Sequence, residues 1–183
     1  MSDISICWFR QDLRLADNPA YFKASAHQQV YPIYIFDDVH PNRYIPGAAS
    51  QWWLHHALSA LDQSLDHKLS LYRGDPLSIL LEMIDKYHIG SVYWNRCYEP
   101  WRIQRDKNIK SKAEEQGIEV NTFNGSLLWE PFKILKNDGT PYRVFSPYYR
   151  KGCLNAEPPR VPIKNPSLSS LIKDDSNNFT LND

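Results

Sequence analysis

The sequence predicts an α/β fold, a Rossmann-like open sheet of five parallel strands with helices on both faces. Five short apolar runs alternate with helical stretches over the first two thirds of the chain. The first run, ISICWF at residues 4–9, is apolar at nearly every position, as is typical of a strand buried on both faces. Alternation at this spacing is typical of βα units, whose strands form a parallel sheet.

Each predicted element has its own local signal. Asn18-Pro19 and Asp75-Pro76 pair a capping side chain with a first-turn proline, and Gly117 follows a charged helix that it terminates. We expect strands at residues 4–9, 30–36, 69–72, 91–94 and 118–123, and helices at residues 19–27, 48–65, 76–88 and 102–116. Residues 1–150 are expected to form this domain, and residues 151–183, rich in Pro, Ser and Asn, to form a linker.

The composition indicates a globular protein with no strong field. Of 183 residues, 42% are hydrophobic and 13% aromatic, and the formal net charge is zero. Residues 96–151 carry 11 basic and 7 acidic side chains, which a partner-docking domain or a solvated helix surface would equally explain. No apolar run reaches the roughly 20 residues that span a bilayer, and the first residues do not resemble a signal peptide. We therefore expect a cytoplasmic protein without a membrane partner.

Several familiar catalytic and nucleotide-binding motifs are missing. The first predicted βα loop has no glycine, so the dinucleotide fingerprint is absent, and there is no P-loop sequence. This disfavours a stand-alone α/β nucleotide-binding protein, which remains the alternative from another class. The three cysteines are far apart and include no C-x-x-C pair, which argues against a disulfide framework and a zinc site.

Charged and aromatic side chains gather where the predicted strands end. In open α/β sheets, ligands bind beyond the carboxyl ends of the strands. Flat aromatic walls with a few polar anchors suit a conjugated ring system. The set includes no paired nucleophile and base, so it indicates a binding domain without catalytic residues. The residues expected at this crevice are Arg10, Asp12, Phe36, Asp37, Trp53, Glu99 and Trp101.

Other interpretations of the same residues stay open. The charges at Arg10, Asp12 and Arg14 also fit a salt-bridged loop that closes the edge of the sheet. Trp53 begins a stripe, spaced four residues apart, that continues through Ala57 and is typical of a helix face packed on the core. An aromatic ring in the first turn of that helix would also stack on a flat ligand.

Four stretches together resemble the amino-terminal domain of the DNA photolyase and cryptochrome family. They read WFRQDLRLADN at residues 8–18, GAASQWWLHHAL at 47–58, WNRCYEPWRIQRD at 94–106 and YRVFSP at 142–147. Their order and spacing extend to about residue 151. The resemblance implies an antenna domain that binds a light-harvesting chromophore and passes its excitation energy to FAD in a second, helical domain.

The resemblance also implies a division of function. The helical domain holds the catalytic FAD and receives the pyrimidine dimer of damaged DNA. We expect the present sequence to stop in the linker before that domain and to be inactive in repair by itself, although the parent protein is a deoxyribodipyrimidine photolyase, a lyase. The same domain of a cryptochrome blue-light photoreceptor is the alternative.

The matching motif positions supply the predicted chromophore contacts. Ser50 and Arg102 join the crevice residues already named. Folate-binding members of the family carry Asn-Glu shortly after the Tyr-Glu dipeptide, whereas Trp101-Arg102 stands there in this sequence. This departure favours a deazaflavin or flavin antenna over a folate.

Overall fold

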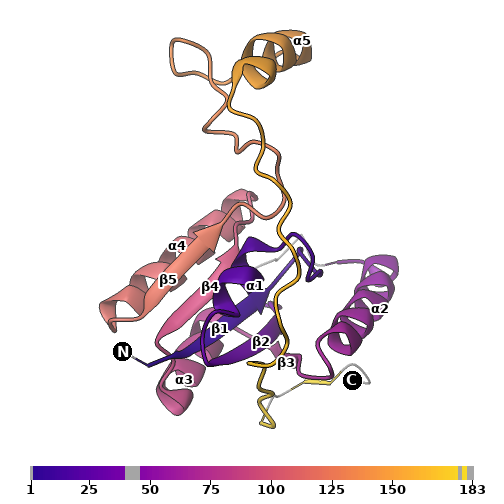
Figure 1. Ribbon diagram of the computed structural model, residues 1–183, viewed down its shortest axis with the longest axis vertical. Coiled ribbons are helices and arrows are strands. Elements are labelled where there is room, and N and C mark those ends of the chain that lie inside the picture. Colours follow the sequence, from indigo (N-terminus) through magenta and orange to yellow (C-terminus); the bar gives the residue numbers. More distant parts are fainter. Residues whose placement is uncertain (1, 40–45, 177–178, 181–183) are drawn as a thin grey trace. The chain divides into compact units, whose positions relative to one another are not determined.

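The computed structural model describes residues 2–39, 46–176 and 179–180 and divides the chain into two compact units (Figure 1). The first unit, called the α/β unit below, comprises Met1–Gly125 together with Ile163–Asp183. The second unit is the intervening segment, Ser126–Pro162. Among the described residues, no helix has the length and apolar character needed to cross a membrane.

The α/β unit contains one parallel sheet of five strands in the order β3-β2-β1-β4-β5. The chain begins in the centre, moves outward through β2 and β3, and then returns to the other side of β1 through β4 and β5. This confirms the predicted sheet, and each strand boundary differs from the predicted one by at most one residue. The strands are β1 (Ile4–Phe9), β2 (Gln29–Phe36), β3 (Ser70–Arg73), β4 (Ser91–Asn95) and β5 (Glu119–Phe123).

In the described part of the α/β unit, four helices connect these strands: α1 (Pro19–Ala24), α2 (Ala48–Ser64), α3 (Pro76–Tyr87) and α4 (Pro100–Glu115). The Asn18 side chain accepts a hydrogen bond from Tyr21 N at 3.1 Å, and Asp75 caps α3 in the same manner. Proline occupies the first turn of α1, α3 and α4, where its missing N–H costs nothing. α1 ends at Ala24, three residues earlier than the sequence predicts.

The helices cover both faces of the sheet with separate cores. Successive residues of β1 point to opposite faces, as the period of a strand requires. Ile6 and Trp8 pack with residues of α3 and α4, whereas Cys7 and Phe9 pack with residues of α1 and α2. β1 is therefore buried on both sides, as its continuous apolar sequence predicts.

The second unit has little regular structure. It contains the short helical segments α5 (Phe145–Pro147), η2 (Tyr148–Gly152) and η3 (Cys153–Asn155). An isolated antiparallel bridge joins Leu135 to Pro141 around the predicted turn at residues 137–139. Residues 151–162 therefore belong to the second compact unit, whereas residues 163–183 belong to the α/β unit. The expected role of residues 151–183 as a linker toward another domain stays a prediction.

Candidate functional site

A cavity of about 460 Å³ opens at the carboxyl ends of β1, β2 and β3 in the α/β unit. The first two turns of α2 and α4 complete its wall. The sheet reverses its order beside β1, so the loops that follow β1 and β4 diverge there and leave space for a ligand. The aromatic residues that line it are Trp8, Tyr34, Phe36, Trp101 and Phe179, and the charged ones are Arg10, Asp37, Asp38, Arg73, Arg102 and Arg105.

A buried chain of ion pairs borders the cavity. Arg105 Nη1 lies 2.9 Å from Asp37 Oδ2, and Arg105 Nη2 lies 2.8 Å from Asp106 Oδ1. Arg10 pairs with the other carboxylate oxygen of Asp106. Burial by itself would lower the pKa of Arg105, but the two carboxylates raise it above its ordinary value, so the guanidinium stays charged. Removing any one partner would leave a buried charge uncompensated.

Guanidinium groups stack on the indole rings of the cavity. The central carbon of Arg105 lies 5.0 Å from the ring centroid of Trp8 and 5.3 Å from that of Trp101. Arg102 lies 4.9 Å from the Trp101 ring. These distances are within the range of cation–π attraction. Each planar guanidinium therefore holds its indole ring in place through packing as well as charge.

Two donors beside the cavity are unsatisfied. Among the residues that the structure describes, the buried Nε atoms of Arg10 and Arg102 make no hydrogen bond. A buried donor without a partner is costly, so an acceptor atom on a bound molecule would relieve it. The cavity thus offers aromatic surface and N–H donors together.

Besides Arg105, two titratable groups at the site have shifted pKa values. Burial raises the pKa of Tyr34 to about 12, so its phenol remains neutral at physiological pH. Burial would raise the pKa of Glu99, but backbone hydrogen bonds, Arg102 and the amide of Gln11 together lower it. Glu99 is therefore ionised at neutral pH.

Five of the nine residues that the sequence predicts at the site line this one cavity. They come from three places that are distant in the sequence: the loop after β1, the end of β2 with the residue that follows it, and the first turn of α4. The five are Arg10, Phe36, Asp37, Trp101 and Arg102.

Asp12 has a different place. Its carboxylate accepts hydrogen bonds from Arg10 N at 2.9 Å and from Asn18 Nδ2 at 3.2 Å, and a third from Asn95 Nδ2. It is 4% exposed and does not line the cavity. Asp12 therefore fastens the loop after β1 to the start of α1 and to the end of β4, which is the loop-closing interpretation of these charges.

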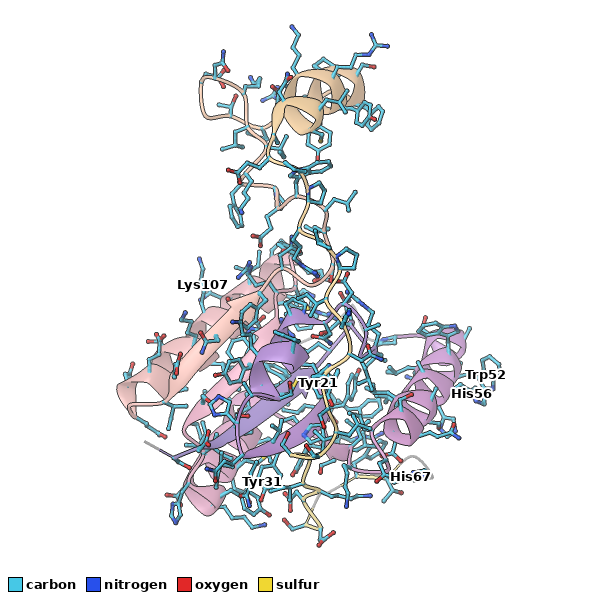
Figure 2. The ribbon with its side chains drawn as sticks, in the orientation of Figure 1. Tyr21, Tyr31, Trp52, His56, His67 and Lys107 are labelled. Carbon is cyan, nitrogen blue, oxygen red and sulfur yellow. The ribbon has the colours of Figure 1, made fainter. Side chains whose placement is uncertain are left out.

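Glu99, Ser50 and Trp53 also lie outside the lining. Glu99 accepts a hydrogen bond from Gln11 Nε2 at 3.1 Å, and Gln11 is itself a lining residue. Ser50 and Trp53 are exposed on the first half of α2, where Figure 2 shows the neighbouring Trp52 on the side away from the sheet. The Trp53 side chain is 66% exposed, so the predicted core-facing stripe does not include it. The roles of all three as chromophore contacts stay predictions.

Four important lining residues are absent from the predicted set. Trp8 precedes Arg10 by two positions and Tyr34 precedes Phe36 by two, so the period of a strand places each pair on one face. Arg105 follows Trp101 by one helical turn. These spacings are signals that would have found them. Phe179 lies in a polar tail without periodicity, and no sequence signal marks it.

Comparison with protein families identifies the domain. Residues 5–167 match the family described as DNA photolyase. The chain belongs to the DNA photolyase family. The match extends over both compact units, and the motifs that resemble the family lie within it.

Individual family members agree with this assignment. Deoxyribodipyrimidine photo-lyase of Agrobacterium fabrum is 39% identical over 92% of this chain and 35% of its own length. Cryptochrome-2 of Arabidopsis thaliana is 36% identical over 85% of this chain and 26% of its own length. The chain thus spans about a third, or less, of these relatives.

Solved structures in the family share the fold. A bacterial class III photolyase from Agrobacterium tumefaciens superposes with a TM-score of 0.87 at 36% identity, covering all of this chain and 38% of that one. An archaeal photolyase from Sulfolobus tokodaii gives a TM-score of 0.72 at 24% identity over 98% of this chain and 40% of that one, which supports the fold alone.

Proposed function

We propose that the cavity binds a light-harvesting antenna chromophore and that this domain serves a deoxyribodipyrimidine photolyase, which repairs pyrimidine dimers in DNA with light. The observation that carries the proposal is the aromatic cavity at the carboxyl edge of the sheet, with guanidinium groups stacked on two of its rings. Membership of the photolyase family supplies the reaction. The part of the chain that the structure describes contributes the residues that bind the chromophore.

The residues present fit a flat conjugated molecule. Pockets for small molecules typically measure about 300–1,000 Å³, and this cavity falls within that range at about 460 Å³. Indole and phenyl rings offer surfaces for stacking, and the unsatisfied Nε atoms of Arg10 and Arg102 suit carbonyl oxygens or ring nitrogens. When bound, such a chromophore absorbs light and transfers excitation energy to FAD. This chain's residues orient it and exclude water.

A deazaflavin or a flavin is favoured over a folate. Trp101 and Arg102 stand where folate-binding relatives carry Asn-Glu, and both side chains line the cavity. The Trp101 indole, held by cation–π contacts to Arg102 and Arg105, contributes a flat wall to the cavity. This wall suits a three-ring system, since the area available for stacking grows with the number of fused rings.

The same domain of a cryptochrome photoreceptor is the second candidate. The Arabidopsis cryptochrome is 36% identical to this chain and the Agrobacterium photolyase 39%, so sequence identity hardly separates the two activities. Under either proposal the partners are the chromophore and a helical FAD domain, with damaged DNA added for a photolyase. A cytoplasmic location accompanies both proposals.

A fluorescence titration tests the chromophore proposal. The purified chain is titrated with a deazaflavin, FMN and a reduced folate, and binding is followed by the change in chromophore emission. We expect saturable binding with the deazaflavin or FMN the tightest. Trp101→Ala should raise Kd about tenfold, the factor expected for loss of one stacking contact.

Trp52→Ala is the matched control, because it removes an indole that is 67% exposed and outside the cavity lining. It should leave Kd unchanged. Trp53→Ala decides whether that residue is a chromophore contact, as the sequence predicts. Absence of binding by all three molecules would contradict the proposal, and so would equal losses in the Trp101 and Trp52 variants.

A further inference from the structure

The segment after residue 162 packs along the α/β unit. Asp17 N donates to Ile163 O at 3.0 Å, and Ile163 N donates back to Asp17 Oδ1 at 3.1 Å. Val30 of β2 donates through its N–H to Ser170 O and accepts a hydrogen bond from Ile172 N, both at 2.9 Å. Figure 1 shows this yellow segment beside β2. Four backbone groups therefore fix its course.

Asp174 anchors the same segment at a buried point. Its carboxylate accepts hydrogen bonds from the hydroxyls of Tyr72 and Tyr87, and its backbone N–H donates to Ser70 Oγ at 2.9 Å. Asp174 is 3% exposed. Burial would raise its pKa, but the hydrogen bonds from Tyr72, Tyr87 and Ser176 lower it to about 2, so the carboxylate is ionised. The anchor joins the segment to both β3 and α3.

Five residues beyond the anchor, Phe179 enters the wall of the cavity. Its ring centroid lies 4.7 Å from that of Phe36, and the rings are inclined at 64°. The guanidinium carbon of Arg73 lies 4.2 Å from the centre of the Phe179 ring. Phe36 ends β2 and Arg73 ends β3, and both line the cavity too. Phe179 is 8% exposed, and its ring is in contact with both Phe36 and Arg73.

We propose that Phe179 contacts the bound chromophore and that residues 163–176 position it there. This inference rests on the proposed function. The segment that the sequence predicts to be only a linker thereby supplies part of the binding site. A ring that both packs on Phe36 and faces the cavity adds stacking or edge contacts to the ligand. A ring that only filled the core would add stability without changing affinity.

The test is a titration of the full chain and its variants with FMN and with a deazaflavin. Phe179→Ala should raise Kd about tenfold, as expected for loss of one aromatic contact. Phe179→Leu keeps apolar bulk and should fall between wild type and Phe179→Ala. Asp174→Asn weakens the anchor of the segment that positions Phe179, and it should raise Kd by a smaller factor than Phe179→Ala does. Circular dichroism identifies a temperature at which every variant is folded, and the titrations are made there.

Phe145→Ala is the matched control, because it removes an identical ring that is 73% exposed in the second unit and should leave Kd unchanged. Wild-type binding with an unchanged Kd in Phe179→Ala would overturn the inference and leave the proposed function intact. Equal losses in Phe145→Ala would also overturn it. Failure of the wild-type chain to bind either molecule would instead overturn the proposed function, and the inference with it.

Discussion

Two clusters of buried carboxylates in the α/β unit are satisfied in different ways. The cavity cluster consists of Arg10, Asp37, Arg105 and Asp106. Its carboxylates are neutralised by guanidinium groups, and the buried Nε of Arg10 makes no hydrogen bond among the described residues. The cluster borders the cavity, where a ligand can complete its hydrogen bonding.

The Asp174 cluster consists of Ser70, Tyr72, Tyr87 and Asp174. Here a single carboxylate accepts hydrogen bonds from the hydroxyls of Tyr72, Tyr87 and Ser176, and one lysine, Lys86, lies 3.7 Å from it through Nζ. The cluster does not border the cavity. Its hydrogen bonds join the segment after residue 162 to the sheet. The comparison indicates that a buried carboxylate whose hydrogen bonds are all made within the chain serves structure, whereas the unmade hydrogen bond beside the cavity leaves a donor for the proposed ligand.

The largest expected effect comes from Arg105→Met, which breaks the cavity cluster. The change leaves Asp37 and Asp106 without their shared partner in a setting where their side chains are 8% and 12% exposed. We expect the free energy of unfolding, measured by urea denaturation, to fall by about 3–5 kcal/mol. Lys112→Met removes an exposed ion pair on the same helix and should change the free energy of unfolding little. Similar losses in the two variants would contradict the prediction.

Asp174→Asn breaks the closed cluster at smaller cost. Asparagine keeps the shape of the side chain but removes the charge and turns one acceptor into a donor that faces a tyrosine hydroxyl. Hydrogen bonds to charged groups contribute about 1.5–3 kcal/mol, so we expect a loss of about 2 kcal/mol in the free energy of unfolding. Asp85→Asn, at an exposed position of α3 with no side-chain hydrogen bond among the described residues, is the control and should have little effect. If Asp174→Asn leaves the free energy of unfolding unchanged, the charge is dispensable for stability.

The pH dependence of unfolding separates the Asp174 charge from its shape. The pKa of Asp174 is lowered to about 2 in the folded chain from an ordinary value of 3.8. The stabilisation is therefore fully present above about pH 4 and is lost as the pH falls toward 2. The difference in urea midpoint between wild type and Asp174→Asn should narrow over this window and stay constant from pH 5 to 7. A constant difference down to pH 2 would exclude the charge as its cause.

Much of the fold is readable from the sequence because burial on both faces leaves a direct pattern. β1 and β4 are mostly apolar and are buried at nearly every position, and the neighbouring helices begin or end at capping residues, prolines or glycine. The same logic finds Arg10 and Asp37, because they immediately follow strands and the ends of parallel strands share one edge. Local pattern and tertiary position agree at these residues.

The residues whose positions were not predicted correctly from the sequence are those whose burial depends on tertiary packing. A spacing of four predicts which face of α2 is apolar, but not how far the sheet covers that face. Leu58 and Leu61 are buried, whereas Trp53, on an earlier turn, is 66% exposed. Phe179 is the opposite case: nothing in its polar surroundings predicts that a distant segment returns to the cavity. Neither outcome depends on the local sequence.

The smallest expected effect comes from Glu99→Gln, at the exposed edge of the cavity. Glu99 lies 3.8 Å from Arg102 and 3.1 Å from Gln11, and its side chain is 41% exposed, so solvent screens the charge. We expect the free energy of unfolding at pH 7 to fall by about 0.5 kcal/mol or less. Because the folded pKa of Glu99 is lowered, this contribution is present above its unfolded pKa and disappears at lower pH.

Measuring both chromophore affinity and stability for Glu99→Gln shows whether Glu99 serves binding, as proposed for the cavity cluster, or structure, as in the Asp174 cluster. If Glu99 contacts the chromophore, as the sequence predicts, Kd rises while stability hardly changes. If Glu99 only orients Gln11 and Arg102, the Kd of Glu99→Gln stays close to that of wild type, and Arg102→Gln alone weakens binding. A large loss of stability in Glu99→Gln would contradict both alternatives, because it would show that this carboxylate has a structural role like that of Asp174.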